Sequence, residues 1–334
     1  MTYSKKERNS VSMLQTRGHI DMSARVPIRV VKLAVSMLFF CASSLRDVFM
    51  TLIGRRPGSG VVIYYHAVPR EYRSQFAHQI DILLRWAKPV TAAQREPCRP
   101  GERCVAITFD DGLKSVVANA LPELQRRQIP ATLFIVVQSL DKTPIWMSSE
   151  NQSADSDRVM SLEELRDLPS DLFIIGSHTL THPRLSELSE TDARREISDS
   201  RTQLQNILKR KVNLFSFPYG IFTDTLVQYC RDAGYERVFT TQPRSALTGP
   251  EEFVSGRIAV EPTDWPLEFR LKILGAYRWL PAAIALKRGL KSALRRPQDS
   301  QRRARSQYDR ESCSPEQRSI ETNLAHGRDP RAED

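Results

Sequence analysis

Cysteine is scarce in this sequence, and its few copies form no recognisable pattern. The chain of 334 residues has five cysteines, an odd number, and no Cys-x-x-Cys pair. A disulfide framework and a zinc ribbon are therefore excluded, although Cys98 and Cys104 could close a small loop. The sequence also has no phosphate-binding loop and no internal repeat, so nothing in it indicates a nucleotide-binding loop or a repeat fold.

No apolar run in the sequence is long enough to be an obvious membrane span. The run between Lys32 and Arg46 is about a dozen residues, whereas a spanning helix needs about 20. A signal peptide would start nearer the N-terminus and end in a small-x-small site, and no such site follows. On a helix, the polar residues of 30–56 fall near one side, which predicts an amphipathic helix that lies on a membrane. A helix packed on the folded domain is an equal alternative, and an uncleaved signal anchor is a third.

Positive charge is concentrated toward the two ends of the chain, whose formal net charge is +10. Residues 1–29 and 297–334 are charged and have few large apolar side chains, so we predict both to be disordered. Residues 267–296 are basic and apolar on one side, and Pro281 interrupts them, which predicts two short amphipathic helices. Such helices suit an anionic membrane surface, or they could equally cap the folded domain. No nucleic-acid partner is predicted.

The most informative stretch is an apolar run that ends on two carboxylates. Residues 104–109 predict a short buried strand, and Asp110, Asp111 and Gly112 follow it directly. Two adjacent carboxylates repel each other, and burying both is costly unless a cation lies nearby. A metal ion is the simplest resolution. The alternative is an exposed Asp-Asp-Gly turn, which is a common structure.

Two further predicted strands also end on side chains that can bind ligands. The strand 172–176 runs into His178 and His182, whose spacing of four lets two imidazoles meet one metal ion. The strand 214–217 runs into an aromatic turn at 218–220. Three strand ends of this kind are typical of the active face of an α/β barrel, where the carboxyl ends of the strands lie together.

Together these motifs resemble those of the polysaccharide deacetylases that share the NodB homology domain (carbohydrate esterase family 4). The matching pieces are Thr108-Phe109-Asp110-Asp111, the His-Thr-x-x-His-Pro stretch 178–183, and Phe215-Ser216-Phe217-Pro218-Tyr219-Gly220. They occur in the family's order, and the resemblance covers residues 60–266. It implies an α/β fold, a distorted (β/α) barrel of the NodB-homology type, here with basic helical extensions at both ends.

The resemblance also implies the chemistry of the site. Asp111, His178 and His182 would hold a divalent metal ion, with zinc expected and cobalt, nickel or iron as alternatives, and positions would remain open for water and substrate. Asp110 would be the general base that takes a proton from the metal-activated water. The backbone N–H of Tyr219 would stabilise the oxyanion.

The resemblance also implies which residues would contact the substrate. Pro218 and Gly220 flank Tyr219 in the same turn, and Thr263-Asp264-Trp265 is similar to the motif whose tryptophan lines the acetyl pocket. The third motif often carries an arginine that pairs with the catalytic carboxylate, but 213–217 has none. Arg257, from a later predicted strand, would take over and orient Asp110. The alternatives are a surface arginine and a core tryptophan.

One departure from the family concerns the general acid, which a late histidine usually supplies. After His182 the only histidine is His326, in the predicted tail. His66 ends the apolar run that begins at residue 61, so we expect it to be the acid or an accessory site residue. The alternative is an ordinary structural histidine.

These observations predict a metal-dependent hydrolase that removes acetyl groups from an acetylated polysaccharide, such as an exopolysaccharide, or from a glycolipid. The expected location is a membrane surface, reached through residues 30–56 as a peripheral helix or an anchor. A non-catalytic carbohydrate-binding relative is the main alternative. A 2-His-1-carboxylate oxygenase is another, but its carboxylate usually lies two residues after the first histidine, where this chain has Leu180.

Overall fold

The computed structural model describes residues 22–55, 58–146, 157–287 and 289. The chain divides into two units, residues 1–281 and 282–334, and residues 282–287 of the second unit are helical. The first unit contains the sheet and the candidate site. The two stretches predicted to be disordered fall outside the described residues except for 22–29, which are helical.

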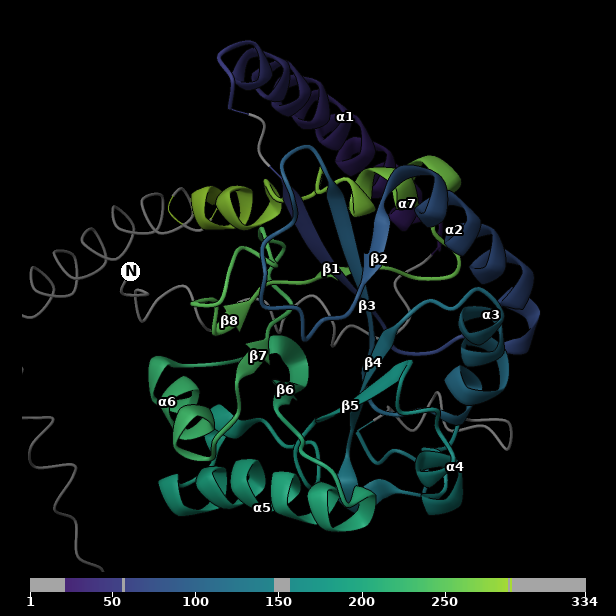
Figure 1. Ribbon diagram of the computed structural model, residues 1–334, viewed down its shortest axis with the longest axis vertical. Coiled ribbons are helices and arrows are strands. Elements are labelled where there is room, and N and C mark those ends of the chain that lie inside the picture. Colours follow the sequence, from purple (N-terminus) through teal and green to yellow (C-terminus); the bar gives the residue numbers. More distant parts are fainter. Residues whose placement is uncertain (1–21, 56–57, 147–156, 288, 290–334) are drawn as a thin grey trace, which may run out of the picture. The chain divides into compact units, whose positions relative to one another are not determined.

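In the described part of the chain, parallel strands form one nine-stranded sheet (Figure 1). The strands are β1 (Ser59–Tyr65), β2 (Lys88–Val90), β3 (Arg103–Phe109), β4 (Ala131–Ile135), β5 (Phe173–Ser177), β6 (Leu214–Ser216), β7 (Arg237–Phe239), β8 (Val254–Ser255) and β9 (Ile258–Ala259). Their order is β8-β7-β6-β5-β4-β3-β1-β9, and β2 pairs with β3 beside this path. The long strands β1 and β3 are nearly continuous apolar runs because a parallel sheet is covered on both faces.

Both ends of this strand order are formed by one segment of the chain. β8 pairs with β7 and β9 pairs with β1, yet only Gly256 and Arg257 separate β8 from β9. The segment therefore touches both edges of the sheet, which bends the sheet into a distorted barrel. The predicted α/β barrel architecture is thereby confirmed.

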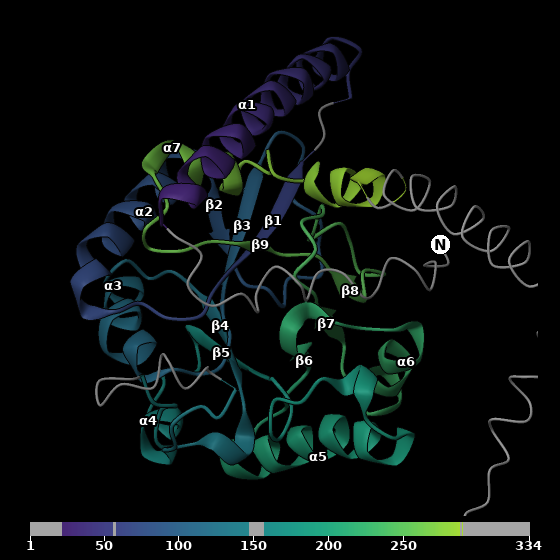
Figure 2. The same cartoon turned by 180° about the vertical axis from the view of Figure 1, so that it is seen from behind.

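Helices lie around the sheet, and a view from behind shows the same arrangement (Figure 2). The α-helices are α1 (Met22–Leu52), α2 (Arg73–Trp86), α3 (Leu121–Arg126), α4 (Leu162–Arg166), α5 (Glu190–Leu208), α6 (Asp224–Asp232) and α7 (Pro266–Ile273). Shorter helical turns are Arg70–Tyr72, Val116–Ala120, Val137–Ser139, Leu185–Glu187 and Pro218–Gly220. α4 starts with a capping box, in which the Ser161 hydroxyl accepts the Glu164 N–H and the Glu164 carboxylate accepts the Ser161 N–H.

The predicted helix 30–56 is observed as α1, but it begins at Met22 and ends at Leu52. In the described part of the chain, its residues 26–52 form the one helix that is long and apolar enough to cross a membrane, with a mean hydropathy of 1.7. The prediction that no apolar run is long enough was wrong, because single charges such as Lys32 and Arg46 do not end the helix. A signal sequence near the N-terminus would meet the same criteria of length and composition.

The part of 267–296 that belongs to the first unit begins with α7, which packs against the folded domain. In α7, apolar residues such as Phe269 and Ile273 are buried, and the helix lies against α2 and β1. The chain then turns at Gly275, where φ is 74°, so the interruption comes before Pro281. For α7, capping of the domain is therefore the correct one of the two alternatives that the sequence left open.

The core beside the site is aromatic. The ring of Tyr65, the last residue of β1, stacks on the ring of Phe109, the last residue of β3, with centroids 5.5 Å apart. Phe76 of α2 packs against both rings. Replacing a buried phenylalanine such as these by alanine typically costs about 3–5 kcal/mol. This packing fixes the two strand ends that lead into His66 and Asp110.

Candidate metal centre

The candidate site lies at the carboxyl ends of β1, β3, β5 and β6. Backbone hydrogen bonds continue the sheet one residue beyond the strands, because the Asp110 N–H donates to the Tyr65 carbonyl and the His178 N–H to the Ile135 carbonyl, each at 2.9 Å. The first residue after β3 is thus held beside β1, and the first residue after β5 beside β4. Side chains from separate loops therefore start from fixed backbone positions.

Asp111, His178 and His182 gather into one buried cluster. Oδ1 of Asp111 lies 3.5 Å from Nε2 of His178 and 3.4 Å from Nε2 of His182. The three residues offer ligand atoms that all lie within 4.8 Å of one another. Such separations suit oxygen and nitrogen ligands that each lie about 2 Å from a central ion. The fold thus brings together the three side chains that the sequence assigned to a metal.

The hydrogen bonds of His178 indicate what the cluster requires. Its Nδ1 lies 2.8 Å from the carbonyl oxygen of Ser216, which can only accept, so this nitrogen carries a proton. The Nε2 of a neutral His178 then turns a lone pair toward Asp111, whose Oδ1 has no hydrogen-bond donor among the described residues. Buried lone pairs that face each other are costly unless a cation lies between them. The donor set therefore fits a divalent ion.

His182 is held in the neutral form and between aromatic rings. Burial lowers the pKa of His182 to about 2. A neutral imidazole is the form that ligates a metal. Trp146 stacks on its ring at a centroid distance of 4.4 Å, and the Tyr219 ring lies 4.7 Å away on an edge. The sequence reasoning missed Trp146, although it is a large aromatic residue in an otherwise polar stretch.

Several residues of the site have a left-handed backbone. The φ angles are 69° for Asp111, 64° for His182 and 58° for Tyr219. Such conformations cost about 1–3 kcal/mol for a residue with a side chain, and they cluster at functional sites. In the turn Pro218–Gly220, Gly220 also has a positive φ of 65°, and a Cβ there would collide with Thr241. The predicted aromatic turn therefore depends on this glycine.

A buried carboxylate fixes the loop that carries the two histidines. Glu196 of α5 accepts the backbone N–H groups of Leu180 and Thr181 at 2.9 and 3.0 Å. Within the loop, Thr179 Oγ1 accepts the His182 N–H at 3.0 Å. These bonds satisfy the buried donors of an irregular loop, which would otherwise favour other conformations. The position of His182 is therefore set from the helix behind it.

Asp110 lies beside the cluster in a buried ion pair with Arg257. The guanidinium donates Nη1–H to Oδ1 at 2.7 Å and Nη2–H to Oδ2 at 2.8 Å, and the Arg257 side chain is fully buried. Its other acceptors are Thr108 Oγ1, Ser216 Oγ and the carbonyl oxygen of Thr240. Burial alone would raise the pKa of Asp110, but the charge of Arg257 and the hydrogen bonds from Arg257 lower it to about 2. Asp110 is therefore ionised.

Two other predicted site residues, His66 and Trp265, lie outside the buried cluster. His66 is exposed at the end of β1, its ring lies 5.5 Å from that of Tyr64, and in its protonated form it would lower the pKa of both Asp110 and His182. Trp265 lies at the start of α7, where its indole packs under the Arg29 guanidinium of α1 at 4.5 Å. This contact was not predicted. The acid role of His66 and the acetyl-pocket role of Trp265 stay predictions.

The sequence is similar to those of known polysaccharide deacetylases. The sequence model of the polysaccharide deacetylase family matches residues 98–238. The chain is 25% identical over 218 residues to YxkH of Bacillus subtilis, covering 62% of this chain and 73% of that protein. It is 22% identical over 232 residues to the poly-beta-1,6-N-acetyl-D-glucosamine N-deacetylase of Staphylococcus epidermidis, covering 64% and 75%.

The fold is also similar to solved structures. IcaB from Ammonifex degensii matches with a TM-score of 0.52 at 24% identity, covering 66% of this chain and 97% of that one. A polysaccharide deacetylase from Bacillus cereus matches with a TM-score of 0.52 at 21% identity, covering 64% and 69%. At these identities the structural likeness supports the fold, namely a parallel sheet with surrounding helices of the NodB-homology type.

Proposed function

We propose that this chain is a polysaccharide deacetylase, a hydrolase that removes acetyl groups from carbohydrates, and that it cleaves the N-acetyl groups of an exopolysaccharide. The observation that carries this proposal is the buried Asp111, His178 and His182 cluster directly beside the Asp110–Arg257 ion pair. A ligand set next to an ionised, oriented carboxylate is what metal-assisted hydrolysis requires. A protein that only binds carbohydrate has no need of this pair.

The metal would be zinc, held by the Asp111 carboxylate and the Nε2 atoms of His178 and His182. Two imidazoles and one carboxylate are a common catalytic zinc set, and cobalt, nickel or iron would suit the same donors. A bound divalent ion lowers the pKa of its water to about 7 and polarises the acetyl carbonyl. The ligand set differs from that of a 2-His-1-carboxylate oxygenase. In the oxygenase pattern the carboxylate lies two residues after the first histidine, where this chain has Leu180, whereas here the carboxylate follows another strand.

The protein's own groups would move the protons. Asp110 would accept the proton of the attacking water at a carboxylate oxygen, while Arg257 keeps that carboxylate aimed and ionised. The Tyr219 N–H would donate to the oxyanion that forms from the acetyl carbonyl. His66 would give a proton to the sugar amine as the C–N bond breaks, so the products are acetate and a free amine.

The substrate would be a polymer of N-acetylated sugar. One relative is named for its action on poly-beta-1,6-N-acetyl-D-glucosamine, which supports this class over the acetylated glycolipid that the sequence also allowed. Trp146 and Tyr219 flank His182 with aromatic faces, on which sugar rings can pack. Trp265 would complete the acetyl pocket.

The purified, zinc-loaded protein should release acetate from poly-beta-1,6-N-acetyl-D-glucosamine. Removing the metal with a chelator should abolish release because the water loses its activation, and added zinc should restore it. An enzyme-coupled acetate assay measures this directly, with heat-denatured protein as the blank. A folded, zinc-loaded protein that binds the polymer but releases no acetate from any acetylated glycan would favour the carbohydrate-binding alternative.

His66→Ala should lower kcat for an N-acetyl substrate by about 10²-fold or more while metal content stays unchanged. An alkoxide leaves with less help from an acid than an amine does, so the loss should be smaller on an O-acetyl substrate. Steady-state kinetics on matched amide and ester substrates measure the difference. His78→Ala on α2 is the control for loss of an imidazole. Equal losses on both substrates would argue against the acid role.

The protein would be associated with a membrane through α1. Four apolar side chains spaced seven apart form one outward stripe on this helix: Val31, Leu38, Leu45 and Leu52 are 62%, 71%, 72% and 80% exposed. The opposite side is partly polar, since Arg29 and Ser36 face the domain. An exposed apolar stripe of this length marks an interaction with lipid or another apolar surface. Because the inner side is docked, the helix would lie along the membrane.

A further inference from the structure

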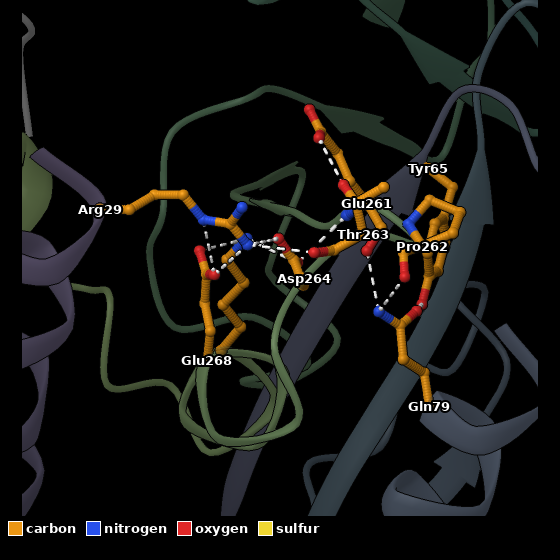
Figure 3. Close-up of polar contacts among 9 residues, drawn as sticks. Arg29, Tyr65, Gln79, Glu261, Pro262, Thr263, Asp264 and Glu268 are labelled. Carbon is orange, nitrogen blue, oxygen red and sulfur yellow. Dashed lines mark hydrogen bonds and ion pairs between the residues drawn. The ribbon is translucent and has the colours of Figure 1, made fainter. Parts of the chain in front are cut away.

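The first half of α1 is fixed to the domain by an ion pair and hydrogen bonds (Figure 3). The Arg29 guanidinium donates two hydrogen bonds to Oε2 of Glu268, at 2.7 and 3.1 Å, and one to the Thr263 carbonyl at 3.1 Å. Farther along α1, the buried Ser36 hydroxyl accepts Nε1–H of Trp279 at 2.9 Å. Groups that are this well paired resist separation, because breaking one pair leaves the partner buried and unpaired.

The loop that receives Arg29 is itself tied to the barrel. Gln79 of α2 donates to the carbonyls of Glu261 and Pro262, at 2.8 and 3.3 Å, and accepts the Tyr65 hydroxyl at 2.8 Å (Figure 3). Tyr65 is the last residue of β1. The position of α1 is thus fixed relative to the sheet by a continuous set of hydrogen bonds.

The second half of α1 leaves a cleft of about 950 Å³ between the helix and the barrel. Its floor is formed at Ser59, Gly60 and Arg103, where β1 and β3 begin. The candidate metal centre lies at the other ends of these strands, so the cleft is not the catalytic site. The volume is within the range of cavities that hold small ligands.

Arg278 faces this cleft without a carboxylate partner among the described residues. One Nη2–H donates to the Gly60 carbonyl at 2.9 Å, but the buried Nε–H has no acceptor. Burial lowers the pKa of Arg278, and the neighbouring Arg46 lowers it further, while Asp47 opposes the shift. A guanidinium that is largely removed from water needs an anion for compensation.

The cleft combines a surplus of positive charge with apolar surface. Its charged lining residues are Arg46, Asp47, Arg103 and Arg278. Three positive charges against one negative charge favour an anionic occupant, and Asp47 is already paired with Arg46 at 3.0 Å. Apolar lining comes from α1, with Phe39, Phe40, Val48 and Leu52, and the same helix also carries Arg46 and Asp47. Leu52 also belongs to the outward stripe, so the cleft opens where that stripe ends.

We propose that this cleft binds one anionic phospholipid, with the headgroup phosphate on Arg278 and Arg103 and an acyl chain along the apolar side of α1. The occupant must be both anionic and apolar, which a free phosphate or an acidic peptide is not. The outward stripe of α1 would place the cleft at the membrane surface, where such lipids are abundant. The proposal goes beyond deacetylation, because it does not involve the metal centre.

The test compares full-length variants on vesicles of phosphatidylcholine with and without phosphatidylglycerol. Arg278→Gln combined with Arg103→Gln should weaken binding to the anionic vesicles about tenfold or more, since each basic group near such a surface contributes about 1 kcal/mol. Arg195→Gln on α5 removes one exposed charge elsewhere and should change binding by less than about twofold. Vesicle cosedimentation gives the dissociation constants.

A second variant separates occupancy of the cleft from charge alone. Ser44→Trp fills the cleft without removing an arginine and should weaken binding to the same vesicles, while acetate release and thermal stability stay unchanged. Unchanged binding in both the double arginine variant and Ser44→Trp would overturn the proposal. The proposal would also be overturned if inorganic phosphate bound to the cleft while the cleft variants bound vesicles as the wild type does. A third contrary result would be lipid binding that appears only after residues 290–334 are deleted, because those residues would then be the occupant.

Discussion

A protein with His178 and His182 both replaced by alanine should retain no zinc at the site and release acetate about 10³-fold more slowly or worse. Without the ion, the pKa of the attacking water returns from about 7 toward that of bulk water, which removes the nucleophile at neutral pH. The Asp111 carboxylate alone cannot replace two nitrogen ligands. Metal analysis after dialysis, together with acetate release, measures both effects.

Stability measurements test zinc binding without relying on enzyme turnover. Zinc that binds only the folded state should stabilise the wild type by about 2.7 kcal/mol at a concentration of 100 Kd, and it should not stabilise the double variant. His78→Ala is the matched loss of one imidazole and should behave as the wild type does. Full zinc occupancy in the double variant would show that the ligands have been misassigned.

Asp110→Asn should keep zinc and lose turnover by about 10²–10⁴-fold. The amide preserves the shape of the side chain and leaves the three ligand residues in place, but it cannot take a proton from water. Because the pKa of Asp110 is about 2, the acid limb of the wild-type rate profile near neutral pH should belong to another group. Zinc content and pH-dependent kinetics test both statements. Lost zinc with unchanged turnover would mean that the roles of Asp110 and Asp111 are exchanged.

The same substitution should change how stability depends on pH. The pKa of Asp110 is lowered in the folded protein, so its charge stabilises the fold above the unfolded pKa, and this contribution is lost as the pH falls toward about 2. Asp110→Asn also leaves Arg257 buried without a counter-ion, which costs about 3–5 kcal/mol. Urea unfolding should therefore give a larger free energy of unfolding for the wild type than for the variant near neutral pH. This difference should narrow between about pH 4 and pH 2.

Features that depend on neighbouring residues were predictable from the sequence. The strand 104–109 is an uninterrupted apolar run, and it is observed as most of β3. The spacing of Ser161 and Glu164 is that of the capping box they form, and Cys98 is paired with Cys104. In each case the partners lie within a few residues, so their geometry follows from local spacing alone.

Features that depend on the closed sheet were harder to predict. Arg257 reaches Asp110 across 147 residues of sequence, and only the pairing of β9 with β1 brings the two together. The sequence suggested this partner only because the usual arginine was missing. Trp146 gave no signal beyond its size. For α1, the hydrophobic periodicity of the sequence showed two faces but not which face packs against the folded domain. That choice depends on Arg29 and Ser36, whose partners lie more than 200 residues away.

The segment that joins β8 to β9 links the integrity of the barrel to its activity. Gly256 has no room for a side chain, because a Cβ there would meet the Gln242 carbonyl oxygen, and the next residue, Arg257, holds Asp110. A local opening between β7 and β1 would therefore withdraw the guanidinium from the carboxylate without disturbing Asp111, His178 or His182. Sub-global openings of this kind occur well below the free energy of complete unfolding. We therefore expect a mostly folded state that keeps the three candidate ligand residues together but has lost the ion pair beside them.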